Sequence, residues 1–360
     1  MAVKIITDST ATLTEEQIKR YDIRRVTLFI VDAIAAAAAG GDDSSGGSVN
    51  DGGGETPIAL AEPEISMDFH EFYGRLKNMD ALPKTAQPAP GDFHKTYTDI
   101  LEAGDDALMI TMSGGLSGTC EGAQMMAEQV MRERPEYAGR IAVVNSCSTG
   151  MGLSYPVLEA ARFAEEGADL ATCKDAAVYT ASCTRFLFVP HSLEYLRRGG
   201  RLGTASALLG SALKLVPILG PDKMTGAVHT YAKVRTFPRA LMTLKDKMLE
   251  DIERSGGLKE LWVQYIAERA EADTFREKVI EPLFGAAMSV PPSSAISPAV
   301  GAHIGPAVGV AYLTNAPVLP ENIAGGLGVL SSAKAGVSER LQAIRESERF
   351  QAIKQKVEGK

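Results

Sequence analysis

Cysteine is scarce in this chain of 360 residues, which contains four in all, and none of them are spaced as Cys-x-x-Cys. The paired Cys and His spacings of a zinc site and the His-Glu-x-x-His motif are absent too. A disulfide framework is not expected in a chain of this length. We therefore predict no metal site and four reduced, mostly buried thiols, at Cys120, Cys147, Cys173 and Cys183.

An excess of basic residues and long apolar runs are also missing. Lys and Arg total 37 against 45 Asp and Glu, a formal net charge of −8, which disfavours nucleic acid or an anionic membrane as the main partner. The most apolar run, residues 28–39, falls short of the ~20 apolar residues that a membrane-spanning helix needs. Asp8 comes too early for the apolar core of a signal peptide. We expect a cytoplasmic protein without integral membrane insertion.

Short apolar runs alternate with helical stretches in the first half of the chain. Strands are expected at 2–6, 24–31, 107–112 and 141–145, and helices after the capping box Thr14–Gln17, over 122–134 and after Ser146. This alternation predicts an α/β domain with a parallel, helix-covered sheet.

The second half follows a different pattern. Helices are expected over 170–185, 239–254 and 271–284, with a strand at 261–267. We predict an N-terminal α/β domain over 1–165, a C-terminal α+β domain over 166–315 and an extension over 316–360. Ser338 is the expected N-cap of a helix over 339–357 that ends the extension.

Residues 40–54 consist almost entirely of Gly, Asp, Ser and Asn. Such a segment buries too little apolar surface to offset the entropy of ordering it. It predicts a flexible insert over 33–58 inside the first domain; the alternative is an anion-binding loop.

The loop after the expected strand at 107–112 offers the clearest candidate binding site. Ser113, Gly114, Ser117, Gly118 and Thr119 supply hydroxyls and backbone N–H groups where a strand leads into a helix. Ligands of parallel α/β sheets bind at this edge, and the start of a helix suits an anion. The alternative is that Ser and Gly only form the turn. The absence of a Walker lysine and of Gly-x-Gly-x-x-Gly disfavours ATP and dinucleotides.

The same loop nearly matches the nucleophile elbow of serine hydrolases, Gly-x-Ser-x-Gly, and fails at the last glycine. His303 follows Ser117 in the chain, as the hydrolase order requires, and flanking glycines are expected to expose its imidazole. A serine lipase or esterase using Ser117 and His303 is therefore the alternative function.

Five motifs occur in an order that resembles the DegV family of bacterial fatty-acid-binding proteins. They span 6–11, 85–88, 116–119, 196–201 and 301–306, and the resemblance extends over about residues 1–313. It implies two α/β domains that hold one long-chain fatty acid between them without catalysis, and no cofactor. Some members of the family present the acid to a fatty-acid kinase, so such a kinase is an expected partner.

The resemblance also implies roles for particular residues. Thr85, Ser117 and His303 match the family positions that hydrogen-bond the carboxylate, and Arg201 is expected near the head group or the kinase. Departures from the family pattern include Ala86, Cys120 and Asn145. They put the preferred chain length and the kinase partnership in question.

A fatty acid also fits elementary energetics. About fifteen methylenes at ~0.8 kcal/mol each yield on the order of 12 kcal/mol of transfer free energy. Hydrogen bonds to a charged acceptor add about 1.5–3 kcal/mol each. The acyl chain is therefore expected to supply most of the affinity, and the polar residues to fix its orientation. A third possibility is a sensor or interaction protein whose lipid is only structural.

Overall fold

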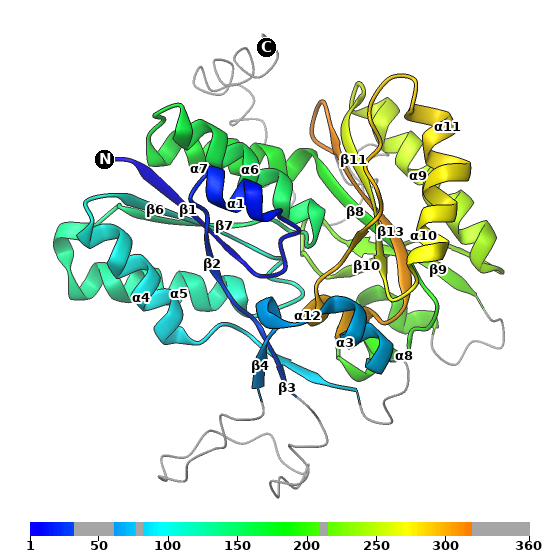
Figure 1. Cartoon of the computed structure of the whole chain (residues 1–360), viewed down its shortest axis with the longest axis horizontal. Coiled ribbons are helices and arrows are strands. Elements are labelled where there is room, and N and C mark those ends of the chain that lie inside the picture. Colours follow the sequence, from blue (N-terminus) through cyan, green and yellow to red (C-terminus); the bar gives the residue numbers. More distant parts are fainter. Residues whose placement is uncertain (32–60, 77–81, 209–214, 319–360) are drawn as a thin grey trace, which may run out of the picture.

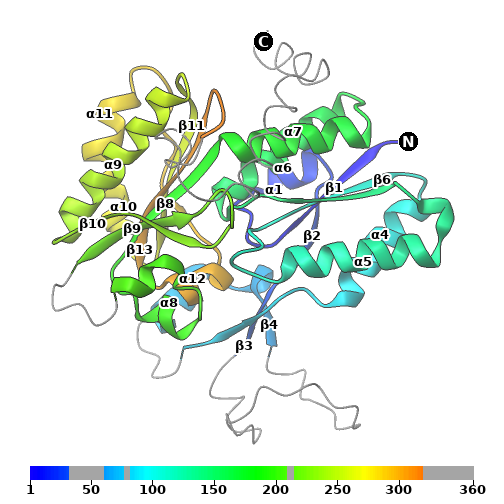
Figure 2. The same ribbon diagram turned by 180° about the vertical axis from the view of Figure 1, so that it is seen from behind.

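The computed structural model describes residues 1–31, 61–76, 82–208 and 215–318. Two helix-covered sheets stand side by side, with a smaller three-stranded layer beneath them (Figure 1). The view from behind shows the same two helix-covered sheets, with the helices α8 and α12 at their junction (Figure 2). The expected insert over 33–58 and the helix expected over 339–357 lie outside the described residues.

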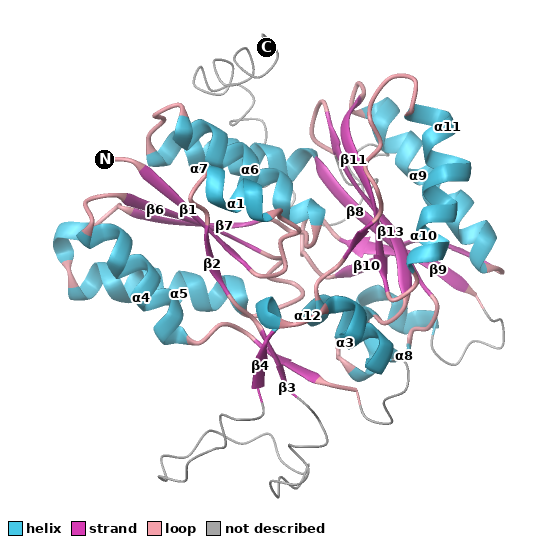
Figure 3. Cartoon of the chain, in the orientation of Figure 1, coloured by secondary structure: helices cyan, strands magenta, loops and turns pink. Residues whose placement is uncertain are grey.

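The first sheet is parallel, as expected from the alternation of strands and helices. Its strand order is β2 (Arg24–Val26), β1 (Val3–Asp8), β6 (Asp106–Thr111), β7 (Ile141–Asn145). One face of this sheet is covered by α4 (Pro90–Glu102) and α5 (Thr119–Glu133), and the other by α1 (Glu15–Arg20), α6 (Met151–Glu165) and α7 (Leu170–Cys183) (Figure 3). The capping box at Thr14 and Gln17 is confirmed.

The second sheet is mostly antiparallel, which confirms a distinct α+β half. Its strand order is β10 (Val228–Val234), β9 (Val216–Pro221), β8 (Thr184–Pro190), β13 (Ala307–Thr314), β11 (Leu258–Ile266), β12 (Ser294–Ala295). Helix α9 (Phe237–Arg254) and the run formed by α10 (Arg269–Phe275), a π-helical turn (Arg276–Ile280) and α11 (Glu281–Phe284) cover its outer face. The helix expected over 271–284 is this interrupted run.

The three-stranded layer joins the two halves. It contains β3 (Phe29–Val31), β4 (Ala61–Pro63) and β5 (Lys84–Ala86). Between β4 and β5 the chain forms a 3₁₀ turn (Glu64–Ser66) and α3 (Phe69–Leu76). Helix α3 packs on α12 (Pro298–Ile304), which in turn packs on α8 (Glu194–Arg198). The chain thus places part of its first third against the last helix of the second half.

Two sequence predictions need correction. The single strand expected over 24–31 is two strands in different sheets, because β2 pairs with β1 whereas β3 pairs with β4 and β5, and Thr27 and Leu28 between them belong to neither. The helix expected over 170–185 ends at Cys183, and the next residues begin β8. The helical sequence pattern extends beyond Cys183, but the residues that follow pair with β13 as part of β8, and this pairing ends the helix.

Helix α7 packs against α6, β6 and β7 of the first sheet. We therefore propose that the first domain extends to about residue 183 and that the second begins with β8. Among the described helices, none combines the length and the apolar character needed to cross a bilayer.

The largest apolar core is shared by the two halves. It contains Ile110 and Met151 from the first sheet and its helices, and Phe186, Phe188 and Ile304 from the second half. Two further cores lie under α4 and α5 and under α9. Because the shared core belongs to neither domain alone, the two sheets are held together by apolar burial.

Candidate functional site

The loop that follows β6 is held by the ends of the neighbouring strands. Asp8, at the end of β1, accepts the backbone N–H of Met112 at 2.6 Å and the N–H and hydroxyl of Thr10. Burial raises the pKa of Asp8, and these hydrogen bonds oppose the rise. Asn145, at the end of β7, accepts the N–H of Gly114 at 3.2 Å. The loop therefore has a defined conformation at the carboxyl edge of the parallel sheet.

The hydroxyls of this loop do not all serve one centre. Ser113 is fully buried and donates to the carbonyl of Gly226 at 2.7 Å, in the turn between β9 and β10. Ser117 Oγ lies 2.9 Å from Thr119 Oγ1 and accepts the N–H of Thr119. Ser113 thus ties the loop to the second domain, while Ser117 organises the start of α5.

Glycine is required where the two domains touch at this loop. A Cβ on Gly115 would lie 2.3 Å from backbone atoms of Gly226 and Ala227. A Cβ on Gly118 would lie 2.5 Å from the amide oxygen of Gln87, in the loop after β5. The distance at Gly115 is to backbone and is too short for any side chain, so this glycine permits close backbone approach between the domains. Gly118 instead packs against the side chain of Gln87 from its own domain.

Thr85 and His303, which are 218 residues apart in sequence, lie in direct contact. Thr85 Oγ1 on β5 and His303 Nε2 on α12 are 2.7 Å apart. The surrounding protein lowers the pKa of His303 to about 4, chiefly through burial and secondly through the positive charge of Arg201. The imidazole is therefore neutral at pH 7 and has one N–H to donate.

The glycines around His303 serve close packing instead of exposing the imidazole as expected. Gly301 faces the ring of Tyr73 and Gly305 the ring of Tyr195, and a Cβ on either would lie within 2.5 Å of the ring. Gly199, in the Gly-Gly turn after α8, faces His303 itself. A Cβ added to Gly199 would lie 2.4 Å from Nδ1 of His303. These glycines do not expose the imidazole as the sequence suggested, because Gly301 in α12 and Gly305 just after it are both buried against aromatic rings.

Arg201 bridges the two domains at the same place. Its Nε donates to the carbonyl of Leu116 at 3.3 Å, and its Nη1 donates to the carbonyl of Gly199. Only one of the three arginines of the 195–201 segment thus reaches the site, because Arg197 and Arg198 pair with Glu194 on the surface.

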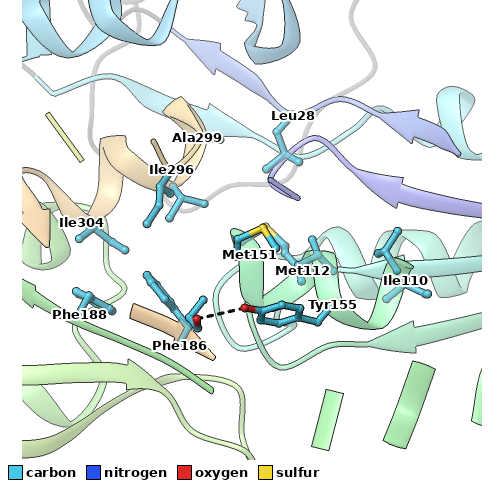
Figure 4. Close-up of a cluster of buried hydrophobic side chains, with 14 of the residues drawn as sticks. Leu28, Ile110, Met112, Met151, Tyr155, Phe186, Phe188, Ile296, Ala299 and Ile304 are labelled. Carbon is cyan, nitrogen blue, oxygen red and sulfur yellow. Dashed lines mark hydrogen bonds between the residues drawn. The ribbon is translucent and has the colours of Figure 1, made fainter. Parts of the chain in front are cut away.

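An apolar cavity of about 40 Å³ begins beside these polar groups. Its polar lining groups are Arg201, His303 and the hydroxyl of Thr149, and the rest of its wall is apolar: Met112, Leu116, Phe186, Phe188, Leu196, Pro221, Val228, Ala299, Val300 and Ile304. Side chains of both halves, among them Met112 and Phe186, point toward one another across this junction (Figure 4). An anionic head with an apolar tail would match this division.

Larger hollows lie away from the sequence motifs. A groove of about 480 Å³ runs between α9 and α10, and a hollow of about 320 Å³ lies between α6, α7 and β11. None of the residues lining either one belongs to the five motifs. No three His, Cys, Asp or Glu side chains of the described ranges gather closely enough to hold a metal ion.

Sequence reasoning missed several residues of this site. Gln87, Asn145 and Gly226 contact the loop that follows β6. The buried carboxylate of Asp8 accepts the N–H of Met112 at the start of this loop, and that of Glu64 accepts the N–H of Ala299 on α12. The acidic residue of the Thr7-Asp8-Ser9-Thr10 motif was visible in the sequence, because it directly follows a strand. Nothing in the sequence distinguishes Glu64 from its neighbour Glu62.

The neutral state of His303 predicts how stability depends on pH. Its pKa in the folded chain, about 4, lies below its usual 6.5, so the unfolded chain binds the proton more tightly between these values. As pH falls from 7 to 4, the wild type should lose about 3 kcal/mol more unfolding free energy than His303→Gln. Urea unfolding of both proteins, freed of lipid, measures the difference. Parallel pH curves would contradict a buried neutral imidazole.

Comparison with known proteins identifies the family. The family model described as the uncharacterised DegV family matches residues 60–315. A DegV domain-containing protein of Clostridium acetobutylicum is 32% identical over 319 residues, which cover 87% of this chain and 98% of that protein. The chain belongs to the DegV family.

Solved DegV structures share the fold. DegV of Bacillus subtilis, described as a fatty acid binding protein, matches with a TM-score of 0.69 and 23% identity, covering 87% of this chain and 99% of that one. A stearic acid-binding protein of Eubacterium ventriosum matches with a TM-score of 0.68 and 19% identity, covering 87% and 98%. These similarities confirm the two-part α/β fold expected from the sequence.

Proposed function

We propose that this DegV protein binds one long-chain fatty acid between its two domains. The carboxylate would lie beside Thr85, Ser117, Arg201 and His303, and the acyl chain would enter the shared apolar core. The observation that carries the proposal is the apolar cavity between the domains, which is lined by the polar groups of Arg201 and His303 beside apolar side chains of both domains. The fatty acids bound by its structural relatives support the same ligand class.

The polar end suits a carboxylate. Arg201 supplies one positive charge, and the neutral His303 and the hydroxyl of Thr85 supply hydrogen bonds. The loop before α5 adds Ser117 and the backbone N–H groups at the start of a fifteen-residue helix. Because Arg201 is charged, the site carries a positive charge in addition to its neutral hydroxyl and imidazole donors.

The cavity must enlarge to admit a long acyl chain. Small-molecule sites enclose roughly 300–1,000 Å³, whereas this cavity measures about 40 Å³. Room can come from new rotamers of Phe186 and Phe188, whose stacked rings line the cavity, or from movement of α12. Binding and release are therefore expected to involve a change at the domain junction.

Presentation of the bound acid to a kinase is the next step of the proposal. The carboxyl end lies near the exposed Gly114 and Gly118, whereas the acyl end points into the core. A partner enzyme could therefore reach the carboxylate while the chain stays buried. This protein would then act as a carrier and perform no catalysis itself.

The geometry gives little support to the esterase alternative. Ser117 Oγ is hydrogen-bonded to Thr119, and His303 to Thr85, so the two do not form the serine–histidine pair of a hydrolase. In the described part of the chain, no carboxylate hydrogen-bonds to His303 to orient it as a base. We propose that Ser117 is not a nucleophile.

Protein purified under native conditions should carry about one long-chain fatty acid per chain, because the buried tail provides most of the affinity. Mass spectrometry of an organic extract measures the amount and the chain length. A fluorophosphonate probe should leave Ser117 unlabelled. A lipid-free extract together with no uptake of added palmitate would refute the carrier function, and labelling of Ser117 would favour the esterase.

A further inference from the structure

Glu64 is a buried carboxylate at the junction of the domains. It opens the 3₁₀ turn after β4, and only 1% of its surface is exposed. Its backbone N–H donates to the carbonyl of Leu28 at 3.0 Å, which fixes the turn on the three-stranded layer. The function proposed above assigns it no role.

The side chain of Glu64 joins the first domain to α12. Ser9, just after β1, donates its hydroxyl to one carboxylate oxygen, and Ala299, in the first turn of α12, donates its N–H to the other at 2.8 Å. Ser9 Oγ also accepts the N–H of Leu28 at 2.8 Å. The carboxylate thus connects the edge of the parallel sheet with the helix that carries His303.

Helix α12 is held to the three-stranded layer at both ends. Near its amino end, the hydroxyl of Tyr73 donates to the carbonyls of Ile296 and Ser297 at 2.6 and 3.0 Å, beside Glu64. Near its carboxyl end, His303 contacts Thr85. Movement of α12 away from this layer would therefore separate His303 from Thr85 and bring water to Glu64.

Within the described ranges, the groups that face Glu64 include no cation. Ser9 and Asp8 face it from the end of β1, Ser297 and Ala299 from α12, and Tyr73 from α3. Burial raises the pKa of Glu64 to about 7, hydrogen bonds from Ser9 and Ala299 oppose the rise, and the charge of Asp8 adds to it. Both protonation states are therefore populated near neutral pH.

We infer that Glu64 is a positioning residue for the carboxylate site: when protonated it holds α12 and His303 in place, and when ionised it favours their separation and release of the bound acid. The release part rests on the proposed function; the effect on His303 does not. The physical reason is that a buried carboxylate without a cation gains hydration when α12 moves away.

The direction and the size of the pH effect on the separation of α12 follow from proton linkage. The pKa of Glu64 is about 7 with α12 in place and returns toward its usual 4.5 once water reaches it. Separation is therefore favoured as pH rises through this interval. Between pH 6 and pH 8, Glu64 alone should increase the equilibrium for separation about tenfold. The pKa of His303 is about 4 while burial lasts and returns toward its usual 6.5 once α12 moves away, so protonation of His303 opposes this effect and leaves a net rise of about two- to threefold in the wild type.

The first measurement is release of a fluorescent fatty acid at pH 6 to 8. The wild-type rate should rise about two- to threefold, whereas in Glu64→Gln, which mimics the protonated acid, the rate should not rise. Glu62→Gln changes an exposed neighbour on β4 and should keep the rise. Ser9→Ala removes a hydrogen bond that lowers the pKa of Glu64, so the rise should move to higher pH. A rise of the same size in Glu64→Gln would overturn the inference.

The second measurement needs no lipid. The chain has five histidines, so the ring resonances of His303 can be assigned in an NMR spectrum by comparison with His303→Gln. They should shift with a midpoint near pH 7 in the wild type and not in Glu64→Gln. Absence of this shift in the wild type would refute the positioning role. Its presence in a chain that takes up no palmitate would refute only the proposed function.

Discussion

Replacing Val300 with phenylalanine is expected to reduce the affinity for palmitate at least a hundredfold. Val300 lies on α12, is 4% exposed and lines the apolar cavity at the domain junction. A ring in this position occupies the space through which the acyl chain must pass. Excluding four methylenes at ~0.8 kcal/mol each removes about 3 kcal/mol of transfer free energy, or a factor of roughly 100–200.

Two comparisons isolate the effect of Val300→Phe. Octanoate, which needs less of the apolar core, should lose much less affinity than palmitate. Met125→Phe adds an aromatic ring on the exposed surface of α5, where the native side chain is 53% exposed, and should change neither affinity. Thermal melting shows whether the variant folds. Full palmitate affinity in a folded Val300→Phe protein would place the acyl chain elsewhere.

Replacing Asp251 with alanine should lower the unfolding free energy by about 3–5 kcal/mol, because it leaves a buried charge without its partner. Asp251 on α9 accepts from Arg185 Nε at 3.1 Å and from the Tyr312 hydroxyl at 2.6 Å. Arg185 is 2% exposed and Asp251 4%. After the substitution, the hydrogen-bond partner left to Arg185 among the described residues is the hydroxyl of Tyr231, at 2.7 Å.

Urea unfolding of matched variants tests the Asp251 prediction. Asp246→Ala, on the exposed face of the same helix, should cost well under 1 kcal/mol. The double variant Arg185→Met with Asp251→Leu should recover most of the loss, because removing both charges removes the need to desolvate either. A loss below 1 kcal/mol for Asp251→Ala would show that water reaches Arg185 in the folded chain.

The structure also explains why this ion pair matters for the candidate site. Arg185 is followed on β8 by Phe186 and Phe188, which line the apolar cavity. Tyr312 lies on the adjacent strand β13, opposite Arg185. The buried pair therefore anchors α9 against the strands that form one wall of the cavity.

The local elements followed from the sequence because they depend on neighbouring residues. The strands β6 and β7, the helices α5 and α9 and the capping box at Thr14 have patterns of period 2 or 3.6 and side chains that satisfy helix ends. The loop of Ser113–Thr119 was also visible, since small residues stand between a strand and a helix. The split of residues 24–31 was not, because each part pairs with strands distant in sequence.

The sequence by itself determined the fold class, several strands and helices, the family motifs and most of the polar residues of the candidate site. Only the tertiary structure decided that His303 contacts Thr85, that Ser113 faces Gly226 and that Glu64, unlike Glu62, is buried between domains. The physical reason is that motif and period describe residues close in the chain. Burial, and with it the shifted pKa values of Glu64 and His303, arises from packing between segments more than two hundred residues apart.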